Sequence, residues 1–79
     1  MSDLEMTKTI KIHLNGKPHE IKAGMTVTDL LTKWRMKPEL VTVEMNEEII
    51  QKLDYESTEI KNNDHVEFVF YMGGGAQRR

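Results

Sequence analysis

Hydrophobic and polar residues alternate with a period of two near the start of the chain. Ile10, Ile12 and Leu14 are apolar, and polar residues stand between them. This alternation is typical of a strand with one buried face. Asn15-Gly16 follows directly, and this dipeptide is the strongest short signal for a hairpin, because both residues tolerate a positive φ. The pattern therefore predicts a β-hairpin at this point.

The second strand of this hairpin is predicted to cover residues 17–22. Proline cannot donate a hydrogen bond to a neighbouring strand, so Pro18 favours an edge position in the sheet. Ile21 is the apolar residue of this strand that is expected to face the core. Ala23-Gly24 then interrupts the sheet.

A helical period follows the hairpin. Four apolar residues recur at the i, i+3, i+4 and i+7 spacing that forms one stripe on a helix: Val27, Leu30, Leu31 and Trp34. Thr26 is predicted to be the N-cap, with Asp29 three residues later completing a variant of the capping box. The pattern predicts a helix over residues 27–34 that ends at Pro38 or just before it.

The second half of the chain returns to a period of two. Residues 41–45 alternate, Asn46-Glu47 is a turn signal, and residues 48–50 are predicted to form a short strand behind that turn. An irregular loop follows. Three apolar residues are expected to anchor this loop to the core: Leu53, Tyr55 and Ile60.

Residues 65–71 are predicted to form the last strand. One face carries Val66, Phe68 and Phe70, and the other carries Glu67, Val69 and Tyr71. A strand with apolar residues on both faces is expected in the centre of a sheet rather than at its edge.

The order of these elements predicts an α+β fold with one main helix packed across a mixed sheet of four or five strands. A hairpin, a helix and a central last strand describe the β-grasp, or ubiquitin-like, roll. The domain is expected over residues 9–72, between a disordered leader at 1–8 and a flexible tail at 73–79. The predicted core consists of Ile12, Leu14, Leu30, Leu31, Val43, Val66 and Phe68.

The composition excludes several classes of protein. The chain has 79 residues, enough for one domain, and its lack of cysteine excludes a disulfide framework and is typical of a reducing cytoplasm. The net charge is -2 with both signs interspersed, so no nucleic-acid-binding stripe is expected. No apolar run approaches the ~20 residues that span a bilayer. His13, His19 and His65 show no metal-ligand spacing and are expected to be ordinary surface or edge residues.

Three glycines, Gly73, Gly74 and Gly75, follow the last predicted strand. Glycine packs nothing, so this triplet forms a thin arm that can enter a narrow channel. A free glycine carboxylate at the end of such an arm has no side chain to obstruct adenylation and sulfur loading. The alternative is an ordinary flexible terminus.

Five segments of the chain resemble the ThiS family of small sulfur-carrier proteins of thiamine biosynthesis, within the ThiS/MoaD branch of ubiquitin-like folds. They are residues 14–17, 24–31, 41–50, 64–69 and 73–75, so the resemblance extends over most of the chain from Ile10 to Gly75. Two turns differ from the family pattern, because Asn46-Glu47 stands where the family often has Asn-Gly and Asn63-Asp64 where it has Gly-Asp. Asparagine is suited to the same turn geometry.

The resemblance implies a carrier and substrate, not an enzyme, with no cofactor or metal of its own. An E1-like adenylating enzyme (ThiF-like) would activate the terminal glycine with ATP and magnesium, a cysteine desulfurase would supply sulfur, and a thiazole synthase (ThiG-like) would accept it. Gly75 is the expected site of adenylation and thiocarboxylate formation, with Gly74 as the alternative. Family members usually stop at the last glycine, whereas here Ala76-Gln77-Arg78-Arg79 follows. Three explanations stay open: the chain is a precursor that a metalloprotease, a further expected partner, trims; the extension is not native; or the carrier function is lost.

Val69, Tyr71 and Met72 stand next to the glycine arm and are predicted to bind the adenylating enzyme. The alternative is that Val69 and Tyr71, on the second face of this strand, pack under a loop instead. Two other functions remain open: a molybdopterin-synthase small subunit, which uses the same glycine chemistry, and a ubiquitin-like binding module that carries no sulfur.

Overall fold

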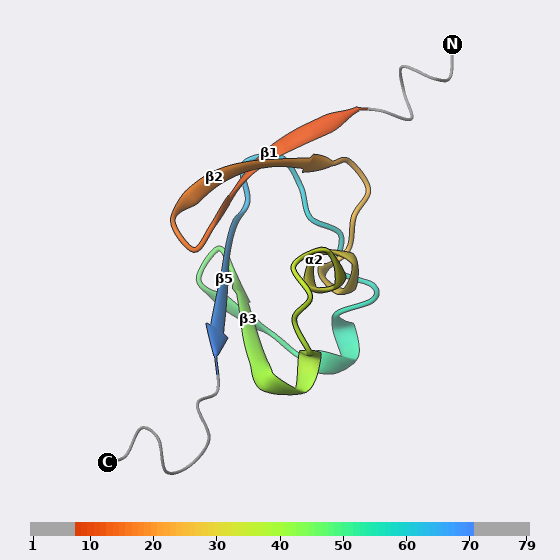
Figure 1. Cartoon of the computed structure of the whole chain (residues 1–79), viewed down its shortest axis with the longest axis vertical. Helices are drawn as coiled ribbons and strands as arrows, with labels where there is room; N and C mark the ends of the chain where they lie inside the picture. The colour runs from red at the N-terminus through yellow and green to blue at the C-terminus, as the bar shows by residue number, and fades with distance from the viewer. Residues whose placement is uncertain (1–7, 71–79) are drawn as a thin grey trace.

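The computed structural model describes residues 8–70, which form a five-stranded sheet and one α-helix (Figure 1). The elements are β1 (Thr9–Leu14), β2 (Lys17–Lys22), α2 (Val27–Lys33), β3 (Val41–Met45), β4 (Glu48–Ile50) and β5 (His65–Phe70), with short 3-10 turns η1 (Pro38–Leu40) and η2 (Lys52–Asp54). The predicted order of elements is confirmed. The predicted last residue of the final strand, Tyr71, lies outside the described residues.

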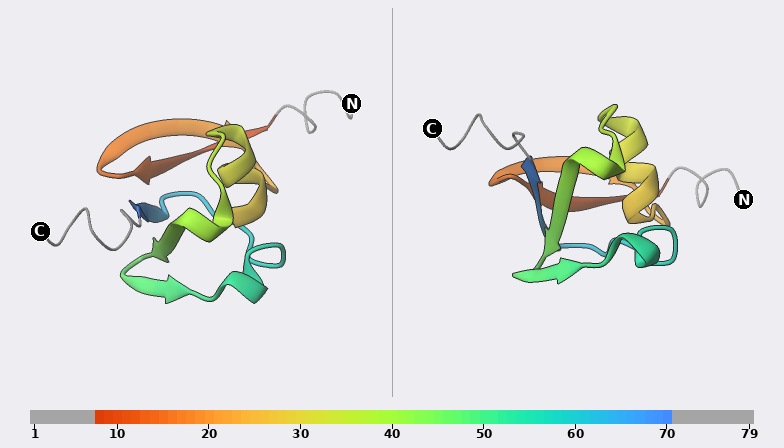
Figure 2. Two further views of the ribbon diagram at one scale, coloured as in Figure 1. Left: turned by 60° about the horizontal axis from the view of Figure 1, so that its bottom comes forward. Right: turned by 90° about the horizontal axis from the view of Figure 1, so that it is seen from below.

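The strand order is β2-β1-β5-β3-β4. β5 lies in the centre, as its two apolar faces predict, and β2 lies at an edge, as Pro18 predicts. β1 and β5 are parallel, and the other neighbours are antiparallel. The sheet curves around α2, which covers one of its faces (Figure 2). This mixed sheet with one helix is the predicted β-grasp fold.

The hairpin between β1 and β2 turns at Asn15 and Gly16, whose φ angles are 52° and 83°. Two consecutive positive φ angles match the type I′ turn that Asn-Gly favours. Asn15 also joins the turn to the central strand. Its backbone N–H donates to the Val66 carbonyl (2.9 Å), and its side-chain oxygen accepts from the Phe68 N–H (2.8 Å). The hairpin turn thus continues the β1–β5 contact beyond the end of β1.

Both ends of α2 are capped. At the start, the Asp29 N–H donates to the Thr26 hydroxyl and the Thr26 N–H donates to the Asp29 carboxylate, which confirms the predicted capping box. The helix ends at Lys33, one residue earlier than predicted, with Trp34 as the C-cap. Arg35 adopts φ 60°, and its N–H and that of the next residue bond back to the last turn in a Schellman motif. The helix therefore ends without the glycine that usually occupies this position.

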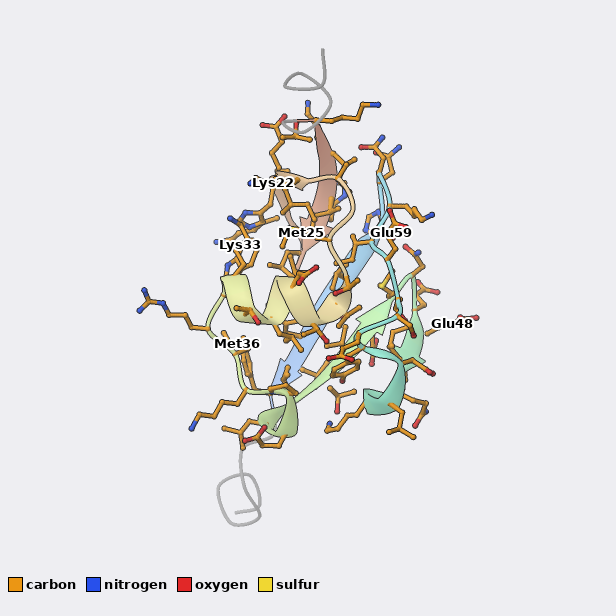
Figure 3. All side chains as sticks on the ribbon, turned by 90° about the vertical axis from the view of Figure 1, so that its right-hand side faces the viewer. Lys22, Met25, Lys33, Met36, Glu48 and Glu59 are labelled. Atoms are coloured by element: carbon orange, nitrogen blue, oxygen red, sulfur yellow. The ribbon has the colours of Figure 1, made fainter. Side chains whose placement is uncertain are left out.

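The core lies between α2 and the sheet, and every predicted core residue is buried. Its buried members are Ile12, Leu14, Ile21, Val27, Leu30, Leu31, Val41, Val43, Tyr55, Ile60, Val66 and Phe68. Met25 and Met36, near the start of α2 and beyond its end, pack against it partly buried (Figure 3). Within residues 8–70, no helix has the length and apolar content that a membrane crossing requires.

One predicted loop anchor is wrong. Tyr55 and Ile60 are buried, but the Leu53 side chain is 96% exposed. Leu53 lies in the middle of η2, a single 3-10 turn, so it cannot face the core together with Tyr55 two residues later. Tyr55 occupies the core position because its hydroxyl has a partner there, the Val43 N–H.

Candidate functional site

The face of the sheet opposite α2 has no covering layer among residues 8–70. Side chains alternate between the two faces of a strand, so the buried Val66 and Phe68 point toward α2 while Glu67 and Val69 point away from it. We call the exposed surface over the last three strands of the sheet the open sheet face. It consists of Thr42 and Glu44 from β3, Ile49 from β4, and His65, Glu67 and Val69 from β5.

The strand register arranges the open sheet face in rows. Thr42 lies opposite Val69, and Glu44 lies opposite Glu67. On its other side Glu44 lies opposite Ile49. Two acidic side chains therefore stand next to each other, with apolar side chains beside them: Ile49 is 61% exposed and Val69 is 46% exposed.

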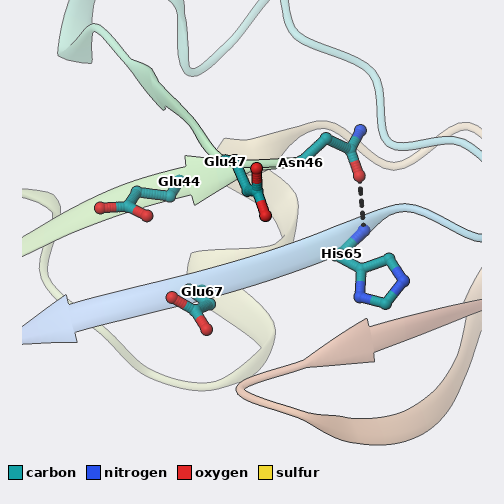
Figure 4. A pocket seen from close by; sticks show the side chains of 5 residues that line it. All are labelled: Glu44, Asn46, Glu47, His65 and Glu67. Carbon is teal, nitrogen blue, oxygen red and sulfur yellow. Dashed lines mark hydrogen bonds between the residues drawn. The ribbon is translucent and has the colours of Figure 1, made fainter.

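A shallow hollow opens at one end of this face, lined by Glu44, Asn46, Glu47, His65 and Glu67 (Figure 4). Asn46 holds the start of β5 against the β3–β4 turn. Its backbone N–H donates to the His65 carbonyl (2.7 Å), its side-chain oxygen accepts from the His65 N–H (2.9 Å), and its side-chain amide donates to Asp64 (2.9 Å). These bonds hold the backbone on both sides of the hollow in one arrangement.

Asn46 and Glu47 have φ angles of 51° and 73°, so the turn signal in the sequence is confirmed. Asparagine tolerates a positive φ, but glutamate rarely adopts it. The turn therefore brings an acidic side chain to the rim of the hollow at a position where glycine would be less strained.

The structure brings together two of the three histidines. His13 of β1 and His65 of β5 are register partners, and their rings stack with centroids 4.4 Å apart. His13 Nδ1 is buried with no hydrogen-bond partner among the described residues. The sequence contains no local signal for this pair, because it forms through the parallel pairing of the first and last strands.

Of the residues predicted to bind a partner, the structure describes Val69. It lies on the open sheet face, half-exposed. Tyr71, Met72 and the glycines Gly73, Gly74 and Gly75 lie outside the described residues. β5 ends at Phe70 among the described residues, so Val69 of the open sheet face lies one residue before the end of this strand.

The candidate functional site among the described residues is a binding surface, the open sheet face. Within the range 8–70, no group of three or more His, Asp or Glu side chains is arranged to hold a metal ion. The one ion pair found in that range joins Lys61 and Glu59 at 3.8 Å, away from the open sheet face. The two neighbouring glutamates Glu44 and Glu67 therefore have no ion-pair partner within the described part of the chain.

Comparison with known proteins gives one family. The ThiS family model matches residues 12–75. The chain is 38% identical over 65 residues to the sulfur carrier protein ThiS of Bacillus subtilis, covering 81% of this chain and 98% of the relative. It is also similar to a crystal structure of the thiamine biosynthesis protein ThiS from Geobacter metallireducens, with a TM-score of 0.74, 36% identity, and coverage of 84% of this chain and 100% of the other.

A second kind of relative is much longer. The chain is 39% identical over 66 residues to a thiazole synthase of Magnetococcus marinus, a match that covers 84% of this chain but 20% of the relative. A thiazole synthase of Paramagnetospirillum magneticum is 33% identical over 69 residues, with 87% of this chain and 21% of the relative covered. The chain thus spans about a fifth of the length of these two proteins.

Proposed function

The chain belongs to the ThiS family, and from that membership we propose that it is a sulfur carrier of thiamine biosynthesis whose reactive group is the carboxylate of Gly75. The observation that carries the proposal is the extent of the family match, which runs from residue 12, within β1, through the rest of the β-grasp domain and ends at residue 75. The 38% identity to the Bacillus subtilis sulfur carrier supports it over nearly the full length of that protein.

The proposed chemistry requires a free carboxylate on glycine. An adenylating enzyme transfers AMP from ATP, with Mg²⁺, to the Gly75 carboxylate and releases pyrophosphate. A persulfide, formed by a cysteine desulfurase, attacks the acyl carbon and displaces AMP. A thiol then cleaves the sulfur–sulfur bond, which leaves a thiocarboxylate on Gly75 and a disulfide on the donor. The chain acts as substrate and carrier in each step, and the catalytic groups belong to its partners.

A thiazole synthase is the proposed acceptor of the sulfur. Two relatives named thiazole synthase contain a segment similar to this chain, amounting to about a fifth of each protein. The presence of a segment similar to this chain within these synthases supports the proposal that a separate carrier binds a separate synthase. The test is to add thiazole synthase and its other substrates to the thiocarboxylated chain and follow the return of the carboxylate by mass spectrometry.

The residues after Gly75 determine whether that carboxylate exists. In the 79-residue chain Gly75 is joined by an amide to Ala76, so it cannot be adenylated. We propose that a protease, for which a metalloprotease is our candidate, removes Ala76-Gln77-Arg78-Arg79. The reactive arm is then Gly73-Gly74-Gly75, a segment without side chains.

Chains ending at Gly74, Gly75 and Arg79 provide the test. Each is incubated with the adenylating enzyme of the same host and ATP, and pyrophosphate release is followed. We expect turnover of the chain ending at Gly75. Rapid turnover of the untrimmed chain would disprove the need for trimming, and turnover restricted to the chain ending at Gly74 would move the reactive group by one residue.

Val69, Tyr71 and Met72 are the proposed contacts to the adenylating enzyme next to the glycine arm. The exposed position of Val69 on the open sheet face supports this role. The substitution Tyr71→Ala is expected to leave folding intact and to slow adenylation, because aromatic residues are common anchors in interfaces. Adenylation at the wild-type rate would show that Tyr71 makes no such contact.

A further inference from the structure

A second surface of interest lies on the α2 side of the sheet, around Trp34. This residue is the C-cap of α2 and packs partly buried against the core. The His19 ring of β2 meets the Trp34 ring edge-on, with the centroids 5.2 Å apart. The Lys33 ammonium lies over the Trp34 ring, 5.7 Å from its centroid. We call the surface formed by His19, Lys33, Trp34 and Arg35 the basic-aromatic patch.

The charges along this part of the chain have one sign. Residues 33–37 contain two lysines and one arginine, and the next acidic residue along the chain is Glu39, in η1. In Figure 3, Lys33 lies on one side of the domain, and Glu48 and Glu59 lie on the opposite side. Within residues 8–70, no carboxylate forms an ion pair with a cation of this segment. The positive charge of the patch is therefore available to a group from outside the described domain.

The stability of α2 accounts for Lys33 but not for Arg35. A lysine in the last turn of a helix interacts favourably with the negative end of the helix dipole. Arg35 lies beyond that turn with φ 60°, a left-handed conformation that costs a residue other than glycine roughly 1–2 kcal/mol. Its side chain is exposed. The domain thus retains a strained arginine where glycine would be more stable, and strain of this kind is concentrated at functional sites.

The chemistry of the patch matches an acidic segment of a protein. A carboxylate can accept two parallel hydrogen bonds from the Arg35 guanidinium, while Trp34 offers an apolar surface beside it. Tryptophan and arginine are the residue types most often found as anchors of protein interfaces. A nucleic acid fits less well, because it is a long polyanion and the whole chain has a net charge of -2. A short acidic segment contacts the patch without approaching the acidic side of the domain.

We propose that the basic-aromatic patch binds an acidic segment of a partner protein. The patch lies on the α2 side of the sheet, and the open sheet face lies on the other side. The two surfaces can therefore be occupied at the same time. The proposal does not depend on the sulfur-carrier function, because it uses neither the glycine triplet nor the open sheet face.

The experiment uses the 79-residue chain and short poly-L-glutamate as the acidic probe. Binding is measured by the fluorescence of Trp34 and, independently, by calorimetry, at low and moderate salt. The variants are Arg35→Gly and Lys33→Gln/Arg35→Gln. The matched control for the double variant is Lys8→Gln/Lys11→Gln, which removes the same charge from two exposed positions outside the patch.

We expect Arg35→Gly to bind the probe about fivefold more weakly than the wild type at low salt, and the double variant about tenfold more weakly, because charge-assisted contacts are lost. The control variant should bind within about twofold of the wild type. The unfolding midpoint of Arg35→Gly should rise, since glycine adopts φ 60° without strain. A loss of binding together with a gain in stability separates a role in binding from a role in folding.

Three results would overturn the inference. The first is a wild-type chain that gives neither a fluorescence change nor a heat of binding with poly-L-glutamate at low salt, or patch variants that bind as well as the control. The second is duplex DNA bound as tightly as poly-L-glutamate, which would show a surface for polyanions in general. The third is self-association of the wild type in sedimentation that the patch variants lose, which would identify a second copy of the chain as the occupant.

Discussion

Tyr55 provides the sharpest test of how the edge of β3 is stabilised. β4 pairs with β3 from Val43 to Met45, so the first part of β3 has no strand neighbour on that side. The Tyr55 hydroxyl takes the place of that strand. It accepts from the Val43 N–H at 3.2 Å and donates to the Val41 carbonyl at 3.5 Å, and the Tyr55 side chain is 3% exposed.

The substitution Tyr55→Phe removes the hydroxyl and keeps the ring, so it creates little cavity. The Val41 carbonyl retains a second donor, the Lys52 ammonium at 3.3 Å, and the bond from the hydroxyl is long. The main loss is therefore at the Val43 N–H, which becomes a buried donor without an acceptor. Such a group costs about 1–3 kcal/mol, and we expect a loss of about 1–2 kcal/mol in the free energy of unfolding.

Urea unfolding followed by the fluorescence of Trp34, the one tryptophan of the chain, measures this loss. A domain of this size is expected to melt roughly 4–8 °C lower for each kcal/mol. Leu53→Ala is the matched control from the same loop, because Leu53 is 96% exposed and should change stability by less than about 0.5 kcal/mol. A Tyr55→Phe variant as stable as this control would refute the proposed role of the hydroxyl.

Three further substitutions test the helix and its ends by the same unfolding measurement. Leu30 is fully buried, so Leu30→Ala should cost ~2–5 kcal/mol, and a loss below about 0.5 kcal/mol would show that it is not part of the core. Thr26→Ala removes the hydroxyl that accepts from the Asp29 N–H and should cost about 1 kcal/mol; no change would show that the capping box contributes nothing. Arg35→Gly should stabilise the domain by about 1 kcal/mol, because glycine adopts φ 60° without strain; a loss of stability would mean that the arginine side chain makes a compensating contact.

Features that arise between residues close together in the chain could be predicted from the sequence. The alternation of Ile10, Ile12 and Leu14, the Asn15-Gly16 turn and the Thr26 capping box depend on interactions over a few residues, and the structure confirms all three. Pro18 also predicts the edge position of its strand, and the structure confirms it. Proline has no backbone N–H, so it cannot complete the hydrogen bonds that a central strand makes on both sides. The glycine triplet Gly73-Gly74-Gly75, to which the proposed chemistry is assigned, follows from the order of residues in the sequence and lies outside the described residues.

Positions within the short loop elements were less predictable. The sequence offers Leu53 and Tyr55 as equal candidates for burial, yet one is almost fully exposed and the other is buried. The difference depends on the direction in which η2 turns and on the polar edge of β3 that the Tyr55 hydroxyl satisfies. The sequence predicts the end of α2 one residue too late, because Arg35 occupies the left-handed position where a glycine would have marked the end of the helix.

The side chains that meet on the open sheet face could not be predicted from the sequence, because they come together through the pairing of strands that are distant in the chain. His13 and His65 stack, and Glu44 stands opposite Glu67, because particular strands become neighbours in a particular register. A shift of the register by one residue would move every side chain of a strand to the other face, and no local pattern specifies which strand lies beside which. That choice follows from burying the apolar faces of all strands against α2 at once, which is a property of the whole domain.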